Sequence, residues 1–170
     1  MKIAVIYATK GGTTRECATL LAQEFKNDEV TLLEIGKDEI SLDGFDRIVI
    51  GFPIKMAKAL PAARKFIKQN EEKLLSLPVG YFITCGFTDC FAEYAEKTIP
   101  APLYERALAI SCFGGSLDHT RYKGFDRWLV KIIRSEILGG GENADQRSDM
   151  TLPTVFEANI SQFADKLRKS

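Results

Sequence analysis

The chain has 170 residues, of which 45% are hydrophobic and 27% are charged. This composition predicts one globular domain spanning residues 1–170 and excludes extended disorder. Because 23 basic residues balance 23 acidic ones, no overall positive charge favours a nucleic-acid partner.

The N-terminal segment has the order strand, loop and helix. An apolar segment at residues 3–8 predicts a buried strand, and the spacing of Cys17, Leu21 and Phe25 predicts a helix. The loop between them, residues 9–14, contains adjacent glycines and three threonines. Adjacent glycines allow a sharp turn, and a helix start offers unpaired N–H groups and the positive end of its dipole. This order predicts a phosphate-binding site. An ordinary turn with Thr13 or Thr14 as N-cap would use the same residues.

Four further strands are predicted along the chain, at residues 30–35, 46–51, 79–84 and 107–113. The predicted helices are one from Leu60 that extends to Leu74, a weak one at residues 89–97 that ends before Pro100 and Pro102, and a last one that Thr154 and Glu157 begin as a capping box. Alternating strands and helices predict an α/β fold with a doubly wound, five-stranded parallel sheet. We expect the strand order 2-1-3-4-5, with the ligand at the carboxyl ends of the strands beside the switch point between strands 1 and 3.

Three loops lie at that edge of the predicted sheet: residues 9–14, 52–57 and 84–90. In the second loop Pro53 stiffens the turn, and Ile54 and Met56 are the nearest apolar side chains. In the third loop, Gly86 permits an unusual backbone conformation. The predicted ligand-binding residues in these loops are Thr9, Lys10, Gly11, Gly12, Thr13, Thr14, Pro53, Ile54, Lys55, Met56, Ala57, Thr84, Cys85, Gly86 and Phe87.

The first loop lacks the glycine spacing of the P-loop and of the dinucleotide fingerprint. Acidic residues are also missing where response regulators of the same fold class carry them, at Ala8-Thr9 and after the third strand. The loop instead resembles the flavodoxin pattern Ser/Thr-x-Thr/Gly-Gly-x-Thr, matched by Thr9, Gly11, Gly12 and Thr14. The resemblance implies that hydroxyl and backbone N–H groups bind the phosphate of flavin mononucleotide (FMN), without a basic side chain such as that of Lys10. It also implies that the second loop lines the flavin ring. For the third loop, the residues themselves suggest hydroxyl and amide contacts to the pyrimidine edge of a flavin, with Phe87 over one ring face.

About 40 residues, 114–153, separate the fifth predicted strand from the last helix, where compact domains use only a few. Within this insertion an amphipathic helix is predicted. Its apolar face holds Phe125, Trp128, Leu129, Ile132, Ile133 and Ile137, and its basic face holds Arg127, Lys131 and Arg134. The helix has three interpretations: it packs on its own domain, lies on an anionic membrane surface, or covers a hydrophobic substrate.

The insertion resembles that of the flavodoxin-type, quinone-linked protoporphyrinogen oxidases. The similarity is carried by Arg121, Tyr122, Phe125, Asp126, Arg127, Trp128, Lys131 and the Gly141-Glu142 pair. It implies that bound FMN takes electrons from a hydrophobic, porphyrinogen-like donor in heme biosynthesis and passes them to a membrane quinone. It also implies peripheral contact with the inner face of the membrane, through the insertion.

Two other functions remain open: a flavodoxin-type electron carrier that docks to a protein redox partner, and an interaction module that keeps the fold without the cofactor. No catalytic side chain is predicted, because the only histidine, His119, is isolated. The cofactor would therefore carry the chemistry. The four cysteines form no Cys-x-x-Cys pair, and no apolar segment reaches the ~20 residues of a membrane span. We expect reduced thiols, no metal site and a cytoplasmic location.

Overall fold

The computed structural model describes residues 1–86, 88–116, 124, 128, 131–132 and 154–169. Within them, five parallel strands pair in the order β2-β1-β3-β5-β6, and β4 pairs antiparallel with β3. Counted along the chain, the parallel strands have the order 2-1-3-4-5, so the predicted α/β topology is confirmed. The strands are β1 (Lys2–Tyr7), β2 (Glu29–Glu34), β3 (Arg47–Lys55), β4 (Lys58–Ala59), β5 (Val79–Thr84) and β6 (Ile110–Cys112).

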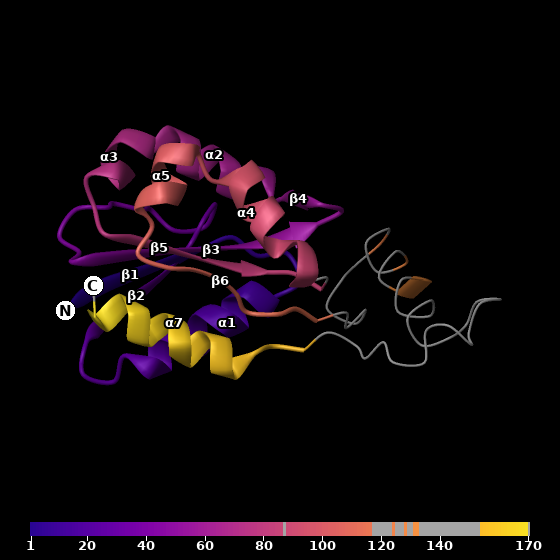
Figure 1. The fold of residues 1–170 in the computed structure, drawn as a ribbon, viewed down its shortest axis with the longest axis horizontal. Coiled ribbons are helices and arrows are strands. Elements are labelled where there is room, and N and C mark those ends of the chain that lie inside the picture. The colour runs from indigo at the N-terminus through magenta and orange to yellow at the C-terminus, as the bar shows by residue number, and fades with distance from the viewer. Residues whose placement is uncertain (87, 117–123, 125–127, 129–130, 133–153, 170) are drawn as a thin grey trace.

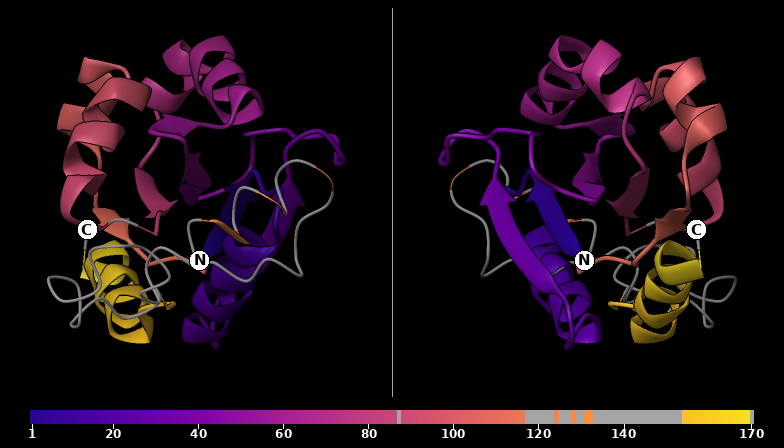
Figure 2. Two further views of the ribbon diagram at one scale, coloured as in Figure 1. Left: turned by 90° about the vertical axis from the view of Figure 1, so that its right-hand side faces the viewer. Right: turned by 90° about the vertical axis from the view of Figure 1, so that its left-hand side faces the viewer.

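Helices cover both faces of the sheet (Figure 1). The views from the two ends show two helix layers with the sheet between them (Figure 2). On one face lie α1 (Thr13–Glu24) and α7 (Glu157–Lys169), and on the other lie α2 (Pro61–Gln69), α3 (Glu71–Leu75), α4 (Phe91–Thr98) and α5 (Ala101–Arg106), with the short 3₁₀ turn η1 (Thr88–Cys90) before α4. Each layer buries its own hydrophobic cluster against the sheet. The alternation of β1 explains this, because Ile3 and Val5 face one cluster while Ala4 and Ile6 face the other.

The third strand is longer than predicted, and the expected loop at residues 52–57 is a β-hairpin. β1 ends at Tyr7, which pairs with Gly51. Beyond Gly51, β3 therefore has no neighbour on its β1 side, and Pro53 can lie in the strand without removing a ladder hydrogen bond there. The strand continues to Lys55 and turns through Met56 and Ala57 into β4, with Lys55 paired to Lys58.

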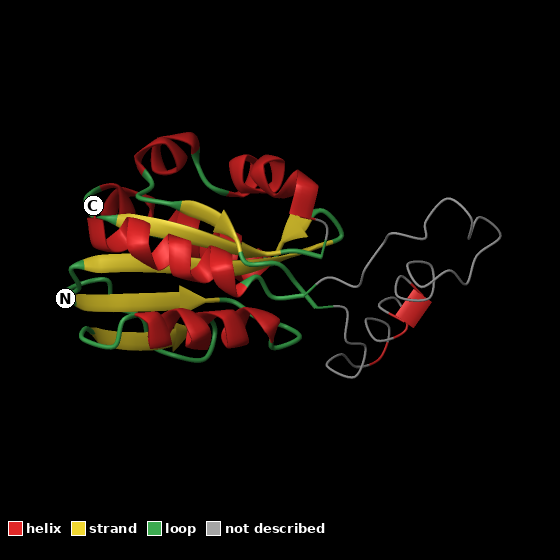
Figure 3. Ribbon diagram, turned by 60° about the horizontal axis from the view of Figure 1, so that its bottom comes forward, coloured by secondary structure: helices red, strands yellow, loops and turns green. Residues whose placement is uncertain are grey.

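Several helices, drawn in red in Figure 3, begin or end at other residues than predicted. The helix from Leu60 divides at Asn70, whose backbone leaves the helical region and whose side-chain amide donates to the Phe66 carbonyl at 2.9 Å. Helix α5 was not predicted, because Pro100 and Pro102 indicated the end of a helix. Pro102 lies in the first turn of α5, where proline does not block a helix. The predicted fifth strand shortens to β6, although Tyr81 N–H to Ala109 O and Phe113 N–H to Ile83 O extend its hydrogen bonding.

The predicted capping box at Thr154 and Glu157 is wrong. The helix begins at Glu157 because the preceding residues pair with the segment after β6 instead. Val155 forms an antiparallel bridge with Gly114, and the Phe156 N–H donates to the Phe113 carbonyl at 3.0 Å.

Most of the insertion lies outside the described residues, including the predicted positions Arg121, Tyr122, Phe125 and Arg127. The described residues Gly124, Trp128, Lys131 and Ile132 are helical and exposed, so the predicted apolar face at Trp128 and Ile132 is not covered by the described residues. Among the helices that the structure describes, none combines the length and the low charge that crossing a bilayer requires.

Candidate functional site

All three predicted loops start at the carboxyl edge of the sheet, on the neighbouring strands β1, β3 and β5. The loop at residues 9–14 follows β1, and Pro53 pairs with Thr84, the last residue of β5. The second and third loops therefore start side by side, next to the loop that follows β1. This edge is the switch point of the doubly wound topology, because β1 pairs with β2 on one side and with β3 on the other.

Gly12 sets the backbone geometry of the first loop. It is the N-cap of α1 with φ 88° and ψ −18°, a left-handed conformation that favours glycine. Its N–H donates to Thr9 Oγ1 at 3.0 Å, and its carbonyl accepts from the Glu16 N–H at 3.0 Å. No side chain caps the helix. The N–H groups of Thr13, Thr14 and Arg15 are therefore first-turn donors without an intrahelical acceptor, the arrangement that binds an anion.

Thr13 provides an independent sign that the loop binds a ligand. The residue is only 7% exposed, and Thr13 Oγ1 is buried without a hydrogen-bond partner. Leaving a buried hydroxyl unpaired costs about 1–3 kcal/mol, so such groups are uncommon unless something else satisfies them. An oxyanion at the start of α1 would accept this hydrogen bond.

Thr14 and Thr84 join two of the predicted loops directly. Their hydroxyl oxygens lie 2.9 Å apart, and both residues are buried. Either hydroxyl can donate to the other. When Thr84 donates, the Thr14 proton stays available for an anion at the helix start.

The remaining predicted residues lie at the same edge in different environments. Pro53, Ile54 and Lys55 are half-buried in β3, whereas Met56, at the hairpin tip, is 72% exposed. Cys85 is buried and its N–H donates to the Gly114 carbonyl at 2.8 Å. Lys10 is exposed and Gly86 is half-buried. Phe87 lies outside the described residues. Whether these residues contact a ligand stays a prediction.

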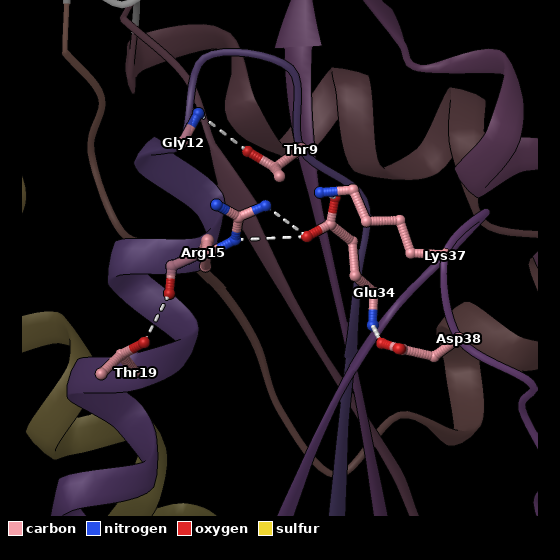
Figure 4. Close-up of polar contacts among 7 residues, drawn as sticks. All are labelled: Thr9, Gly12, Arg15, Thr19, Glu34, Lys37 and Asp38. Atoms are coloured by element: carbon pink, nitrogen blue, oxygen red, sulfur yellow. Dashed lines mark hydrogen bonds and ion pairs between the residues drawn. The ribbon is translucent and has the colours of Figure 1, made fainter.

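A charged cluster that the sequence did not predict lies next to the first loop (Figure 4). Glu34, the last residue of β2, is buried and accepts hydrogen bonds from Arg15 in the first turn of α1. Its other carboxylate oxygen lies 2.7 Å from Lys37 Nζ. Burial raises the pKa of Glu34, but the hydrogen bonds from Lys37 and Arg15 outweigh it and hold the pKa below its usual value. In the sequence, the charged Glu34 at the end of a largely apolar strand is the feature that could have indicated this cluster.

Among the described residues, no group of three or more His, Cys, Asp or Glu side chains is arranged to hold a metal ion. The site therefore offers hydroxyls, backbone N–H groups and apolar surface. This chemistry suits a phosphorylated organic molecule with an apolar part.

The comparisons with known proteins agree with this architecture. The sequence model described as "Flavodoxin domain" matches residues 4–144. The chain is 26% identical over 185 residues to a protoporphyrinogen IX dehydrogenase [quinone] of Escherichia coli (strain K12), covering 98% of each. It is 25% identical over 157 residues to a flavodoxin of Nostoc sp. (strain PCC 7120), covering 88% of each.

A comparison with solved structures finds proteins of similar fold. A Fusobacterium nucleatum flavodoxin bound to flavin mononucleotide superposes with a TM-score of 0.50 at 14% identity, over 99% of this chain and 97% of the other. At that identity the superposition supports the fold alone.

Proposed function

The chain belongs to the flavodoxin domain family, and on that premise we propose that it is an FMN-dependent oxidoreductase that moves electrons from a protoporphyrinogen-like donor to a quinone. Two observations support the proposal together. One is the anion site at the start of α1, where Thr13 Oγ1 is buried without a partner. The other is similarity over 98% of both chains to a quinone-linked dehydrogenase of protoporphyrinogen IX.

FMN is the cofactor, and the described residues fit its phosphate monoester. The first turn of α1 supplies N–H donors and the positive end of the helix dipole. Thr13 supplies an unpaired hydroxyl, and Thr14 supplies a second hydroxyl whose position the bond to Thr84 fixes. These groups can bind the phosphate without a basic side chain. This agrees with the resemblance, which implies that Lys10 is not a phosphate ligand.

When bound, the flavin supplies the electron-transfer chemistry. The chain contributes binding and shape. The β3–β4 hairpin presents half-buried Ile54 and exposed Met56 beside the strand ends, where the apolar part of a flavin or donor would lie. The backbone of Cys85 is held by its bond to the Gly114 carbonyl, which fixes the start of the third loop.

The proposal is tested with the purified full-length protein. We expect it to carry FMN or to bind added FMN stoichiometrically, as the visible flavin spectrum reports. Anaerobic addition of protoporphyrinogen IX should then bleach the flavin absorption, and addition of a quinone should restore it. Flavin that stays oxidised in the presence of the porphyrinogen would contradict the proposed donor and leave the family-level function intact.

The second candidate is an electron carrier that docks to a protein partner, favoured by the similarity to the Nostoc flavodoxin. A redox titration separates the two. An electron carrier should show two resolved one-electron steps and rapid exchange with a partner protein, whereas the dehydrogenase should show a single two-electron step. The third interpretation, a cofactor-free interaction module, requires a colourless protein that does not bind FMN.

A further inference from the structure

The first turn of α1 forms hydrogen bonds with two strands of the sheet, one on each side. On one side Thr14 bonds to Thr84 at the end of β5. On the other side Arg15 bonds to Glu34 at the end of β2, through its Nε at 3.2 Å and its terminal nitrogen at 2.5 Å. In the order β2-β1-β3-β5 these two strands flank the pair that forms the switch point. These two contacts therefore fix the orientation of the first turn of α1 relative to the sheet.

We propose that Glu34 is a positioning residue for the phosphate site, which acts through Arg15 to hold the first turn of α1 in its anion-binding conformation. This inference rests on the proposed function, because the anion is the FMN phosphate. Glu34 itself lies at the end of the neighbouring strand, so it acts without a contact to the ligand.

The Glu34 side chain is held in one position by its hydrogen-bond and ion-pair partners. Its side chain is 10% exposed, and each carboxylate oxygen has a cationic partner: Arg15 on Oε2 and Lys37 on Oε1. Its backbone N–H donates to Asp38 Oδ2 at 2.6 Å. The ladder pairs Glu34 with Tyr7, and the Ile35 N–H donates to the Tyr7 carbonyl at 2.8 Å. Glu34 is thus locked to the strand end that leads into the phosphate loop, and Arg15 is fixed against it (Figure 4).

Positioning matters here because the phosphate is bound mainly by directional donors. The N–H groups of Thr13, Thr14 and Arg15 and the hydroxyls of the threonines must point at one place before the ligand arrives. A helix start that moves in the free protein would lose affinity, because binding would then have to order it.

Charge alone predicts the opposite effect. A carboxylate close to a phosphate dianion repels it, so removal of the negative charge should tighten binding. The positioning role predicts that the same change weakens binding, because Arg15 loses its anchor. The sign of the effect of Glu34→Gln therefore separates the two explanations.

The test measures the dissociation constants of FMN and of riboflavin, which lacks the phosphate, for the full-length protein freed of bound flavin. We expect Glu34→Gln to weaken FMN about tenfold and riboflavin by less than about twofold. Arg15→Gln and the double variant should resemble Glu34→Gln, because the two residues act as one unit. Arg15→Lys should restore part of the affinity. Asp165→Asn, which breaks the exposed pair with Arg168 in α7, is the matched control and should change neither constant.

Glu34→Asp is a second variant, which keeps the test valid if Glu34→Gln does not fold. It retains the negative charge but brings the carboxylate one methylene less far toward Arg15. Positioning predicts weaker FMN binding by this variant, whereas repulsion through space predicts no change. Tighter FMN binding by Glu34→Gln, or equal losses for FMN and riboflavin, would overturn the proposal. If the unaltered protein bound riboflavin and FMN equally, the proposed phosphate site would fail instead.

Discussion

The hydroxyl oxygens of Thr14 and Thr84 lie 2.9 Å apart in the interior, although 70 residues separate them in the sequence. This hydrogen bond joins the first turn of α1 to the end of β5. Two loops that the sequence placed at the same edge of the sheet are therefore joined directly by a buried hydrogen bond.

Replacement of Thr84 by valine tests this bond. Valine keeps the shape but leaves the Thr14 hydroxyl buried without its partner, so we expect the free energy of unfolding to fall by about 1–2 kcal/mol. The affinity for FMN should also fall, because Thr14 loses its orientation. Urea unfolding and flavin titration measure the two effects. The variant with both threonines replaced should be less destabilised than the sum of the single variants, since no unpaired hydroxyl remains.

Thr13→Val should separate binding from stability. The Thr13 hydroxyl has no partner in the free protein. Its replacement by a methyl group should leave the melting temperature unchanged or raise it, since an unpaired buried hydroxyl is costly. FMN affinity should fall about tenfold through the lost hydrogen bond to the phosphate. Thr98→Val, at the end of α4 and away from the first loop, is the control. A lower melting temperature with full FMN affinity would mean that Thr13 has a structural role.

The sequence predicted the five parallel strands and their order because their apolar segments alternate with helical ones, and β1 and β5 are indeed buried at nearly every position. It also located the loop at residues 9–14 between a strand and a helix, although the same glycines and threonines would suit an ordinary turn. It could not predict the hairpin after Pro53, because Met56 and Ala57 lack the Asn-Gly signal of such turns. Nor could it join Arg15 to Glu34, because that pair depends on how α1 lies over β2. Position 87 is outside the described residues, so its predicted contact with the flavin stays a prediction.

The tip of the β3–β4 hairpin carries backbone strain. Met56 has φ 50° and Ala57 has φ 60°, a region that residues with a Cβ atom rarely adopt. Ala57→Gly should therefore raise the free energy of unfolding by about 0.5–1 kcal/mol, and Met56→Asn should act in the same direction. Differential scanning calorimetry measures the change. Ala62→Gly, in the exposed first turn of α2, is the matched control and should lower stability instead. Destabilisation by Ala57→Gly would contradict a strained turn.

Gly51 marks the place where β3 has no room for a side chain. A Cβ atom there would lie 2.0 Å from Cζ of Phe82. The Phe82 ring cannot easily move, because it stacks on Phe113 with centroids 4.6 Å apart. We expect Gly51→Ala to destabilise the protein by about 2–3 kcal/mol. The double variant with Phe82→Leu should lose less than the two single variants together, which chemical denaturation would measure.

Glu34 should make stability depend on acid pH. Its partners Lys37 and Arg15 lower its pKa in the folded protein below the usual value of 4.5, despite the opposing effect of burial. A carboxyl group with a lowered pKa binds protons more readily when unfolded, so its contribution to stability is complete above pH 4.5. That contribution is lost as the pH falls through the lower, folded-state pKa. Glu34→Gln should therefore flatten the fall in melting temperature below pH 4.5 relative to the unaltered protein. Asp165→Asn again serves as the control, because Asp165 is exposed. Equal acid sensitivity of the unaltered protein and Glu34→Gln would show that the Arg15–Glu34–Lys37 cluster does not stabilise the folded chain.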